Sequence, residues 1–331
     1  MSAPTLDVLA IGNAIVDVIA RADDAFLAAE GMAKGGMQLI DAATAEGLYG
    51  RMGAGIEASG GSAANTVAGL AALGHRCGFI GQVADDQLGA VFGHDIRALG
   101  VTFDVAPRGG TAPTARCLIL VTEDGQRTMN TFLGASQFLP EAALDADLIA
   151  SAAILYLEGY LWDPEEPRAA MRKAIEVARA AGRRIAFSLS DGFVIARHGG
   201  DFHSLIGGGL IDILFANEAE ITALAGTDDF EAAVAAVAPK VPLLVVTRGA
   251  DGAIAVQGAT RTEVGAEPVA KVVDTTGAGD LFAAGFLAGQ AQGRDVRASL
   301  RMGAIAAAEV ISHYGARPEA DLKALVAGAL G

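Results

Sequence analysis

The segment Asp274-Thr-Thr-Gly-Ala-Gly-Asp280 places small residues and a carboxylate between a predicted strand, residues 268–273, and a predicted apolar helix. Backbone N–H groups at the start of a helix have no intrahelical partners, so they can bind an anion. Glycine has no Cβ, which lets a phosphate approach the backbone closely. The donors expected here are the N–H groups of Gly277, Ala278 and Gly279. Phosphoryl transfer is the chemistry that this arrangement suits.

Asp280 lies in the first turn of the predicted helix, where it would face the bound anion. A carboxylate in that place can accept the proton of an attacking hydroxyl, so Asp280 is the candidate general base. The helix dipole alone also favours an acid in a first turn, by roughly 0.3–1 kcal/mol. The catalytic interpretation therefore depends on the whole block and not on Asp280 alone.

A second glycine segment, Gly60-Gly61-Ser-Ala-Ala-Asn65, opens a helix predicted over residues 62–73 and closed by Gly74. Paired glycines leave room for a ligand against the backbone. Asn65 offers both a donor and an acceptor and can bridge the hydroxyl groups of a sugar. A glycine turn followed by a capping polar residue would explain the same residues.

Asp17 follows the first predicted strand in the segment Gly12-Asn13-Ala-Ile-Val-Asp17. A carboxylate that accepts two neighbouring hydroxyls is a common way to hold a polyol. A solvated loop acid is the alternative interpretation.

Composition restricts the class of protein. The 331 residues are 52% hydrophobic and 19% charged, enough for a sizeable core in one large domain or in a large and a small one. The formal net charge of −15 argues against nucleic acid or an anionic membrane as a partner. Two cysteines, Cys77 and Cys117, fit buried thiols in a reducing cytoplasm. The N-terminus lacks a basic signal-peptide region, and no apolar stretch reaches membrane-span length.

Short apolar runs alternate with helical patterns along most of the chain. This alternation predicts an α/β fold with a mostly parallel sheet covered by helices on both faces. One predicted helix opens at Asp163-Pro164, with Asp163 as its cap, and closes at Gly182. The buried strands are predicted at Leu6–Ile11, Cys77–Ile80, Ala152–Leu157, Arg184–Leu189, Ile211–Phe215 and Leu243–Thr247.

A small β lid is expected beside this sheet. Residues 115–122 and 126–133 read as a hairpin through Glu-Asp-Gly, and residues 14–20 and 36–40 are extended with little helix to pack on. The lid would comprise residues 14–41 and 109–133, and the large unit residues 1–13, 42–108 and 134–331. Gly60-Gly61 and Gly109-Gly110 lie near the junctions and are candidate hinges.

The two glycine segments resemble the two signatures of the ribokinase-like (PfkB) carbohydrate and nucleoside kinases. The first covers residues 60–68 and continues to residue 89, and the second is the segment 274–280. The resemblance runs from Asp7 to Gly315. It implies a three-layer α/β/α core with a β lid, and transfer of the γ-phosphoryl group of ATP, with Mg²⁺, to a primary hydroxyl.

The resemblance also implies roles for side chains at the acceptor end. Arg127, in a lid strand, would reach the transferring phosphate, although an exposed hairpin arginine is most often a solvated charge. The residues expected to bind the acceptor are Asn13, Asp17, Gln38, Gly60, Gly61, Asn65 and Asn130. Apart from the resemblance, Tyr160 or Trp162, after the predicted strand 152–157, is a candidate to stack on a base, with simple packing as the alternative for either.

At the nucleotide end, Asn217 and Glu220 are spaced as a helix capping box, which needs no catalytic role. In the resembling kinases an Asn-x-x-Glu also organises water around Mg²⁺, and both interpretations are compatible. The chain has no P-loop, and no Gly-x-Gly-x-x-Gly follows the first strand. The residues expected near ATP are Asn217, Thr247, Gly249, Gly252, Thr276 and His313.

The opening Gly12-Asn13 with Asp17, and the segment Met37-Gln-Leu-Ile40, favour adenosine kinases within the family, with the 5′-hydroxyl of adenosine as acceptor. A kinase for a free sugar or another nucleoside is the alternative, and a catalytically silent nucleoside sensor is a third. The resemblance leaves K⁺ dependence open, because backbone carbonyl ligands near Asp274 leave no side-chain signature. The sequence also leaves a monomer and a homodimer open.

Overall fold

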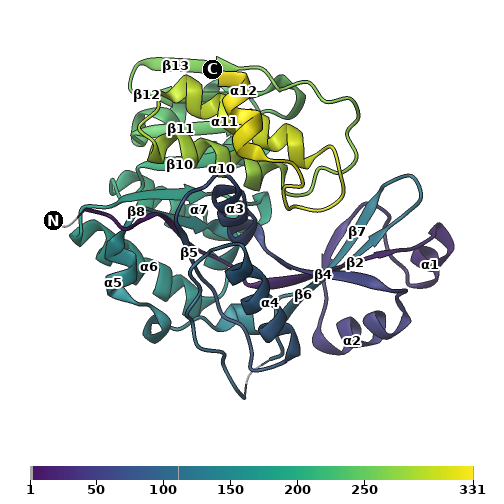
Figure 1. Cartoon of the computed structure of the whole chain (residues 1–331). Helices are drawn as coiled ribbons and strands as arrows, with labels where there is room; N and C mark the ends of the chain where they lie inside the picture. The colour runs from purple at the N-terminus through teal and green to yellow at the C-terminus, as the bar shows by residue number, and fades with distance from the viewer. Residues whose placement is uncertain (1–2, 111, 331) are drawn as a thin grey trace.

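The computed structural model describes residues 3–110 and 112–330, and its larger sheet has the strand order β13-β12-β11-β10-β9-β8-β1-β5 (Figure 1). The strands from β11 to β5 along this sheet are parallel, and β12 and β13 are antiparallel additions at one edge. The predicted mostly parallel sheet is confirmed. Its strands are β1 (Leu6–Ile11), β5 (Cys77–Ile80), β8 (Ala152–Glu158), β9 (Arg184–Ser188), β10 (Ile213–Asn217), β11 (Leu243–Thr247), β12 (Ala253–Gln257) and β13 (Thr260–Val264).

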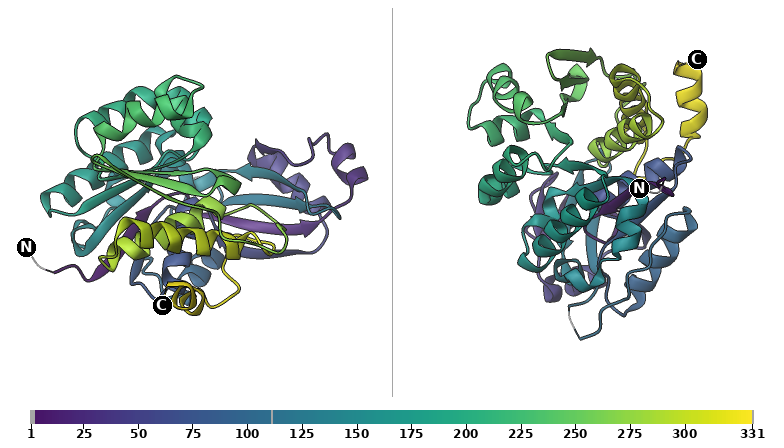
Figure 2. Two further views of the ribbon diagram at one scale, coloured as in Figure 1. Left: turned by 90° about the horizontal axis from the view of Figure 1, so that it is seen from above. Right: turned by 90° about the vertical axis from the view of Figure 1, so that its left-hand side faces the viewer.

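Helices cover both faces of the large sheet (Figure 2). One face carries α3 (Ser62–Ala72), α10 (Ala278–Ala291) and α11 (Val296–Val310), with α12 (Leu322–Leu330) packed on α11. The remaining helices of the large unit are α4 (Gln87–Ala98), α5 (Ala146–Ser151), α6 (Glu165–Ala180), α7 (Gly192–Gly207), α8 (Glu218–Ala225) and α9 (Phe230–Val237). In the described ranges, no helix combines the length and the apolar character needed to cross a membrane.

The five-stranded sheet, here called the lid sheet, projects from the right of the body in Figure 1 and has the order β3-β7-β6-β2-β4. Its strands are β2 (Ile15–Arg21), β3 (Met37–Leu39), β4 (Gly55–Gly60), β6 (Ala115–Val121) and β7 (Arg127–Phe132), accompanied by α1 (Asp24–Ala29) and α2 (Ala42–Arg51). Strands β6 and β7 form the predicted hairpin. The expected boundary placed residues 55–60 in the large unit. Strand β4 pairs with β2, however, so these residues belong to the lid sheet.

The core lies between the large sheet and its two helical layers. Strand β1 is fully buried from Val8 to Ile11, as is usual for a parallel strand covered on both faces. Both cysteines are free and buried, as expected, Cys77 in β5 and Cys117 in β6 of the lid sheet.

The prediction of a strand at residues 268–273 is wrong. This segment is irregular, because Pro268 has no N–H to donate and Val272 is half exposed. The N–H of Val273 instead donates to the carbonyl of Ile311 at the end of α11, at 2.8 Å. A loop, rather than a strand, therefore leads into α10.

The predicted cap of α6 is also wrong. Pro164 is the N-cap residue, and Asp163 lies one position earlier, as the C-cap of the short 3₁₀ segment Gly159–Trp162. The carboxylate of Asp163 instead binds the guanidinium of Arg197 and the ring of His198 on α7, at 2.7 and 2.9 Å, and the charge-assisted bond to Arg197 is a stronger one than a helix N–H offers.

Helices α3 and α10 lie in close contact across a glycine. A Cβ placed on Gly69 would lie 2.5 Å from Leu281 Cδ1 and 2.8 Å from Ala284 Cβ. The hydroxyl of Thr66 also donates to the carbonyl of Asp280 at 3.2 Å. The spacing of these two helices therefore has no room for a side chain at residue 69.

We predict that Gly69→Val forces α3 away from α10 and lowers the free energy of unfolding by about 1–3 kcal/mol, the usual cost of overpacking a core. Urea titration followed by circular dichroism measures this loss. Gly200→Ala in α7 is the control, because a Cβ there meets no atom within 4 Å and alanine is the better helix former. A Gly69→Val protein as stable as the unmodified chain would contradict the tight packing.

Candidate active site

A cavity of about 540 Å³ lies between the lid sheet and the carboxyl ends of the parallel strands. Parallel α/β sheets commonly bind ligands at this edge, because loops and helix N-termini converge there. The sequence-predicted residues that line the cavity are Asn13, Asp17, Gly61, Asn65, Tyr160, Asn217, Glu220, Thr247, Thr276, Gly277, Gly279 and Asp280. Those that the structure does not bring to its lining are Gln38, Gly60, Arg127, Asn130, Gly249, Gly252, Ala278 and His313.

The turn into α10 contains the three residues expected to form a backbone cradle, and two of them lie at the cavity. Gly277 is the N-cap in a left-handed conformation, with φ of 77°, and no side chain caps the helix. A Cβ on Gly277 would lie 2.7 Å from Ala316 Cβ, so glycine is required here on two grounds. The N–H of Ala278 donates back to the carbonyl of Thr275 at 3.2 Å, which turns this donor away from the cavity. Gly277 and Gly279 are the cradle residues that border the open space.

Asp280 lines the cavity and is held by two side chains from the start of α3. The hydroxyl of Ser62 donates to its Oδ1 at 2.6 Å, and the amide of Asn65 donates to its Oδ2 at 3.0 Å. Burial raises the pKa of Asp280 above its ordinary value, and these two hydrogen bonds oppose that rise. The carboxylate is therefore oriented towards the cavity and made more basic than a solvated aspartate. Sequence reasoning missed Ser62, because a serine at a helix start has an ordinary local use.

Glu158, at the end of β8, is a buried carboxylate that sequence reasoning also missed. It accepts hydrogen bonds from the backbone and side-chain nitrogens of Asn13, both at 2.6 Å, and from the N–H of Ala63 at 2.7 Å. Burial raises the pKa of Glu158 to about 7. Glu158 thus joins the loop after β1 to the start of α3, and a Cβ on Gly12 would collide with it at 2.5 Å.

Asp17 points from β2 into the cavity, with its carboxyl group against Gly60. A Cβ on Gly60 would lie 2.4 Å from the carboxyl carbon of Asp17. Gly60 therefore makes room for Asp17 instead of contacting the cavity itself. Burial raises the pKa of Asp17 to about 6, while the positive charges of Arg317 and Arg127 lower it.

Arg317, from the segment after α11, is a third residue that sequence reasoning missed. Its guanidinium donates to the carbonyls of Ser59 and Ala64, at 3.0 and 2.9 Å, and its charge acts on Asp17 and Asp280. Arg317 therefore fastens the Gly60-Gly61 turn and offsets part of the negative charge of the cavity.

The inner face of the lid sheet is largely apolar. In β2, β3, β6 and β7 alternate residues point inward, and those that line the cavity include Ile15, Met37, Leu39, Cys117, Ile119, Met129 and Thr131. Gln38 and Asn130 belong to the opposite set and bind each other at 2.7 Å. Asn130 is fully buried there, beside Met32 and the carbonyl of Leu118. Their strand phase therefore points them away from the cavity.

Tyr160 and Phe193 form a second apolar wall, beyond β8 and β9. Their rings lie 6.1 Å apart between centroids, and both line the cavity. The guanidinium of Arg197 covers the Phe193 ring at 4.8 Å.

At the other end of the cavity, Asn217 and Glu220 form the predicted capping box at the start of α8. The amide of Asn217 donates to Glu220 Oε1 at 2.6 Å, and the N–H of Glu220 donates to Asn217 Oδ1 at 2.8 Å. Burial raises the pKa of Glu220 to about 7, and the charge of nearby Asp191 adds to the rise. The capping interpretation is confirmed, and the same carboxylate borders the cavity.

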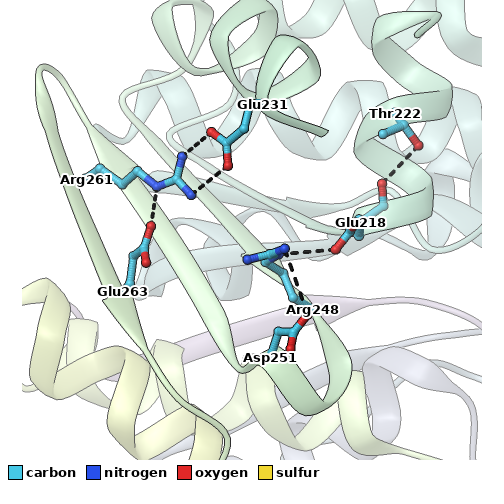
Figure 3. Close-up of polar contacts among 7 residues, drawn as sticks. All are labelled: Glu218, Thr222, Glu231, Arg248, Asp251, Arg261 and Glu263. Carbon is cyan, nitrogen blue, oxygen red and sulfur yellow. Dashed lines mark hydrogen bonds and ion pairs between the residues drawn. The ribbon is translucent and has the colours of Figure 1, made fainter. Parts of the chain in front are cut away.

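The turn between β11 and β12 is tied to α8 by Arg248 (Figure 3). Arg248 lies between Glu218, at 3.2 Å, and Asp251, at 3.9 Å, and covers the Phe230 ring at 4.5 Å. A Cβ on Gly252 would lie 2.1 Å from the carbonyl of Val264, so this glycine shapes the turn.

His313 lies at the end of α11, where its Nε2 is 3.1 Å from the buried carboxylate of Glu309. The same carboxylate accepts the N–H groups of Glu319 and Ala320, at 2.9 and 2.8 Å. In this structure His313 therefore helps to fold the segment after α11.

A family model described as pfkB family carbohydrate kinase matches residues 7–322. A 5-dehydro-2-deoxygluconokinase of Shouchella clausii is 29% identical over 279 residues, covering 81% of this chain and 86% of that protein. A fructokinase of Klebsiella pneumoniae is 29% identical over 242 residues, covering 71% and 78%.

Two solved structures are similar over nearly the whole chain. A probable sugar kinase from Rhizobium etli has a TM-score of 0.92 and 47% identity, covering 98% of this chain and 99% of that one. An adenosine kinase from Sinorhizobium meliloti has a TM-score of 0.91 and 50% identity, with the same coverage.

The buried carboxylate of Glu158 predicts a dependence of stability on pH. Glutamate titrates near about pH 4.3 when unfolded, and the folded pKa of Glu158 is about 7. Between these two pKa values, the folded state holds a proton on Glu158 that the unfolded state has released. The contribution of Glu158 to stability is therefore complete below about pH 4.3 and is lost as pH rises through 7.

We therefore expect Glu158→Gln to flatten the fall in stability between pH 5 and pH 8, measured by urea titration at several pH values. Glutamine can accept fewer hydrogen bonds than glutamate, so one N–H that binds Glu158 stays unpaired and the variant is less stable at low pH. The informative quantity is therefore the slope of stability against pH. Glu176→Gln, on the exposed side of α6, is the control with an unchanged slope. Equal slopes in Glu158→Gln and the unmodified chain would contradict the raised pKa.

Proposed function

Because this chain belongs to the PfkB family of carbohydrate kinases, it is an ATP-dependent phosphotransferase, and we propose that its acceptor is the 5′-hydroxyl of adenosine. Solved structures at 47% and 50% identity are named for a sugar and for a nucleoside, and curated relatives at 29% identity are named for sugars, so the family alone leaves a sugar or nucleoside acceptor. The choice of adenosine rests on the chemistry of the cavity.

The observation that carries this proposal is the apolar wall beside the acceptor end. Ile119 and Met129 of the lid sheet, with Tyr160 and Phe193 of the body, line the same cavity as the polar residues around Asp280. A free sugar presents hydroxyl groups in every direction, and burying them against such a wall without hydrogen bonds costs free energy. A purine presents two apolar faces and suits aromatic and aliphatic contacts.

The polar end of the cavity suits a ribose. Asp17 offers carboxylate oxygens to neighbouring hydroxyls of the sugar, and Asn65 offers its side-chain oxygen as a further acceptor. Oδ1 of Asn65 is buried with no hydrogen-bond partner in the described part of the chain, while its amide nitrogen binds Asp280. A substrate hydroxyl would supply the missing donor.

In the proposed reaction the 5′-oxygen attacks the γ-phosphorus, the bond to ADP breaks, and the hydroxyl proton passes to Asp280. The raised pKa of Asp280 favours this proton transfer. The cradle at Gly277 and Gly279 would bind the oxygens of the transferring group. Donors aimed in advance at developing charge are typically worth roughly 2.7–4 kcal/mol each.

The residues at the nucleotide end fit Mg²⁺ held through water. Glu220, Asn217 and Asp191 all border the cavity and offer the oxygen acceptors that this hard cation prefers. No group of three His, Cys, Asp or Glu residues suited to direct metal binding occurs in residues 3–110 and 112–330. When bound, Mg²⁺ would neutralise charge on the phosphates of ATP.

A free-sugar kinase is the second candidate, favoured by the fructokinase and 5-dehydro-2-deoxygluconokinase names of curated relatives. A silent nucleoside sensor is a weaker candidate, because a binder needs no base held by two side chains.

We expect adenosine to give the highest kcat/KM with ATP in a panel that includes ribose, fructose and inosine, measured by ADP release and by detection of AMP. The apolar wall is the physical reason, since it can pack on the purine. 5′-Deoxyadenosine is the matched control: it keeps the base and should inhibit without turnover. A higher kcat/KM for fructose or ribose would transfer the assignment to a sugar, and binding without any turnover would favour the sensor.

Asp280→Asn should leave ATP and adenosine binding measurable by calorimetry while kcat falls by roughly 10²–10⁴-fold, the usual contribution of a positioned base. Asp163→Asn is the control, because Asp163 borders the same cavity but is paired with Arg197 and His198. Near-normal turnover in Asp280→Asn would remove the base assignment.

A further inference from the structure

Arg127 belongs to the lid sheet, but its guanidinium pairs with a carboxylate of the body. It forms an ion pair with Asp274, and the two side chains are only 5% and 3% exposed. Apart from this pair, its side-chain nitrogens have no hydrogen-bond partner in the chain as described. An isolated buried arginine is unfavourable, so this pair depends on the lid lying against the body.

Asp274 in turn holds two backbone segments that frame the cradle. Its Oδ1 accepts the N–H of Thr276 and its Oδ2 accepts the N–H of Gly315, both at 3.0 Å. Thr276 directly precedes Gly277, whose Cα faces Ala316 too closely for any side chain. The position of the cradle therefore depends on Asp274.

The tip of the β6–β7 hairpin rests on the same segments. A Cβ added to Gly125 would lie 3.6 Å from the carbonyl of Val273 and 3.5 Å from the hydroxyl of Tyr314. The hairpin, Asp274 and the cradle are thus in continuous contact when the lid sheet lies in the observed position.

We propose that Arg127 is a positioning residue that acts through Asp274, so that the anion cradle is fully ordered only while the lid covers the acceptor. Lifting the lid removes the cation from a buried carboxylate, and the turn at residues 274–277 then relaxes towards water. The cradle would hold the transferring group in place chiefly when an acceptor is enclosed, which limits transfer to water. This role differs from the direct phosphate contact expected from sequence resemblance. It rests on the family's kinase activity and not on the identity of the acceptor.

The first test measures backbone amide hydrogen exchange in the full-length protein without substrates. Arg127→Met should speed exchange in residues 274–280 as well as in its own hairpin, although residues 274–280 form the turn and the start of α10 and lie outside the lid sheet. Arg116→Met is the matched control: this arginine lies in the same hairpin, over the Tyr49 ring, and should leave residues 274–280 unchanged. Arg127→Lys, which keeps a cation, should give intermediate exchange and replaces Arg127→Met if the latter fails to fold. Unchanged exchange at 274–280 in the folded Arg127 variants would overturn the proposal.

The second test is a double-mutant cycle on turnover, with whichever acceptor the panel identifies. Arg127→Met and Asp274→Asn should each lower kcat by roughly tenfold or more, and the double variant should fall no further than the more affected single variant. Arg127→Met should also raise the share of ATP hydrolysed to water. Additive losses with an unchanged hydrolysis share would mean that Arg127 acts on the phosphate directly, which overturns the role through Asp274. If adenosine is not the acceptor, the exchange experiment and this cycle still decide the role of Arg127.

Discussion

The site depends on the contact between α3 and α10. Gly69 lets the two helices approach until Ser62 and Asn65 can both bind the carboxylate of Asp280. The candidate base, Asp280, and Asn65, which is expected to bind the substrate, are far apart in the sequence. The contact between the two helices brings them within hydrogen-bond distance. The same two hydrogen bonds limit the rise in pKa that burial causes. Orientation and basicity are therefore set by one helix pair.

The cavity collects acidic groups at a cost to stability. Asp17, Glu158 and Glu220 all have raised pKa values because the folded protein shields them from water. Hydrogen bonds to Glu158 and the charge of Arg317 offset part of this cost. Burying carboxylates at such a cost is typical of functional sites, where groups are arranged for a ligand and not for the stability of the protein alone.

The two faces of the lid sheet explain why Gln38 and Asn130, two residues expected near the acceptor, do not line the cavity. Side chains alternate along a strand, so a shift of one residue moves a side chain to the opposite face. Gln38 and Asn130 take the outer face and bind each other, while their neighbours Met37 and Met129 face the cavity. Arg127 has the same strand phase as Met129, and its ion pair with Asp274, rather than the choice of face, directs its guanidinium away from the open space.

Patterns within short segments determined much of this protein from its sequence: the parallel strands such as Leu6–Ile11, the β6–β7 hairpin, the Asn217–Glu220 capping box and the glycine turn before Asp280. These features depend on residues a few positions apart. Only the tertiary structure decided that Glu158 and Ser62 border the site, that Arg317 fastens the glycine turn beside it, and that residues 268–273 form no strand. The partners of those residues lie far away in the chain, and burial, charge and strand phase are set only when the sheets and helices pack.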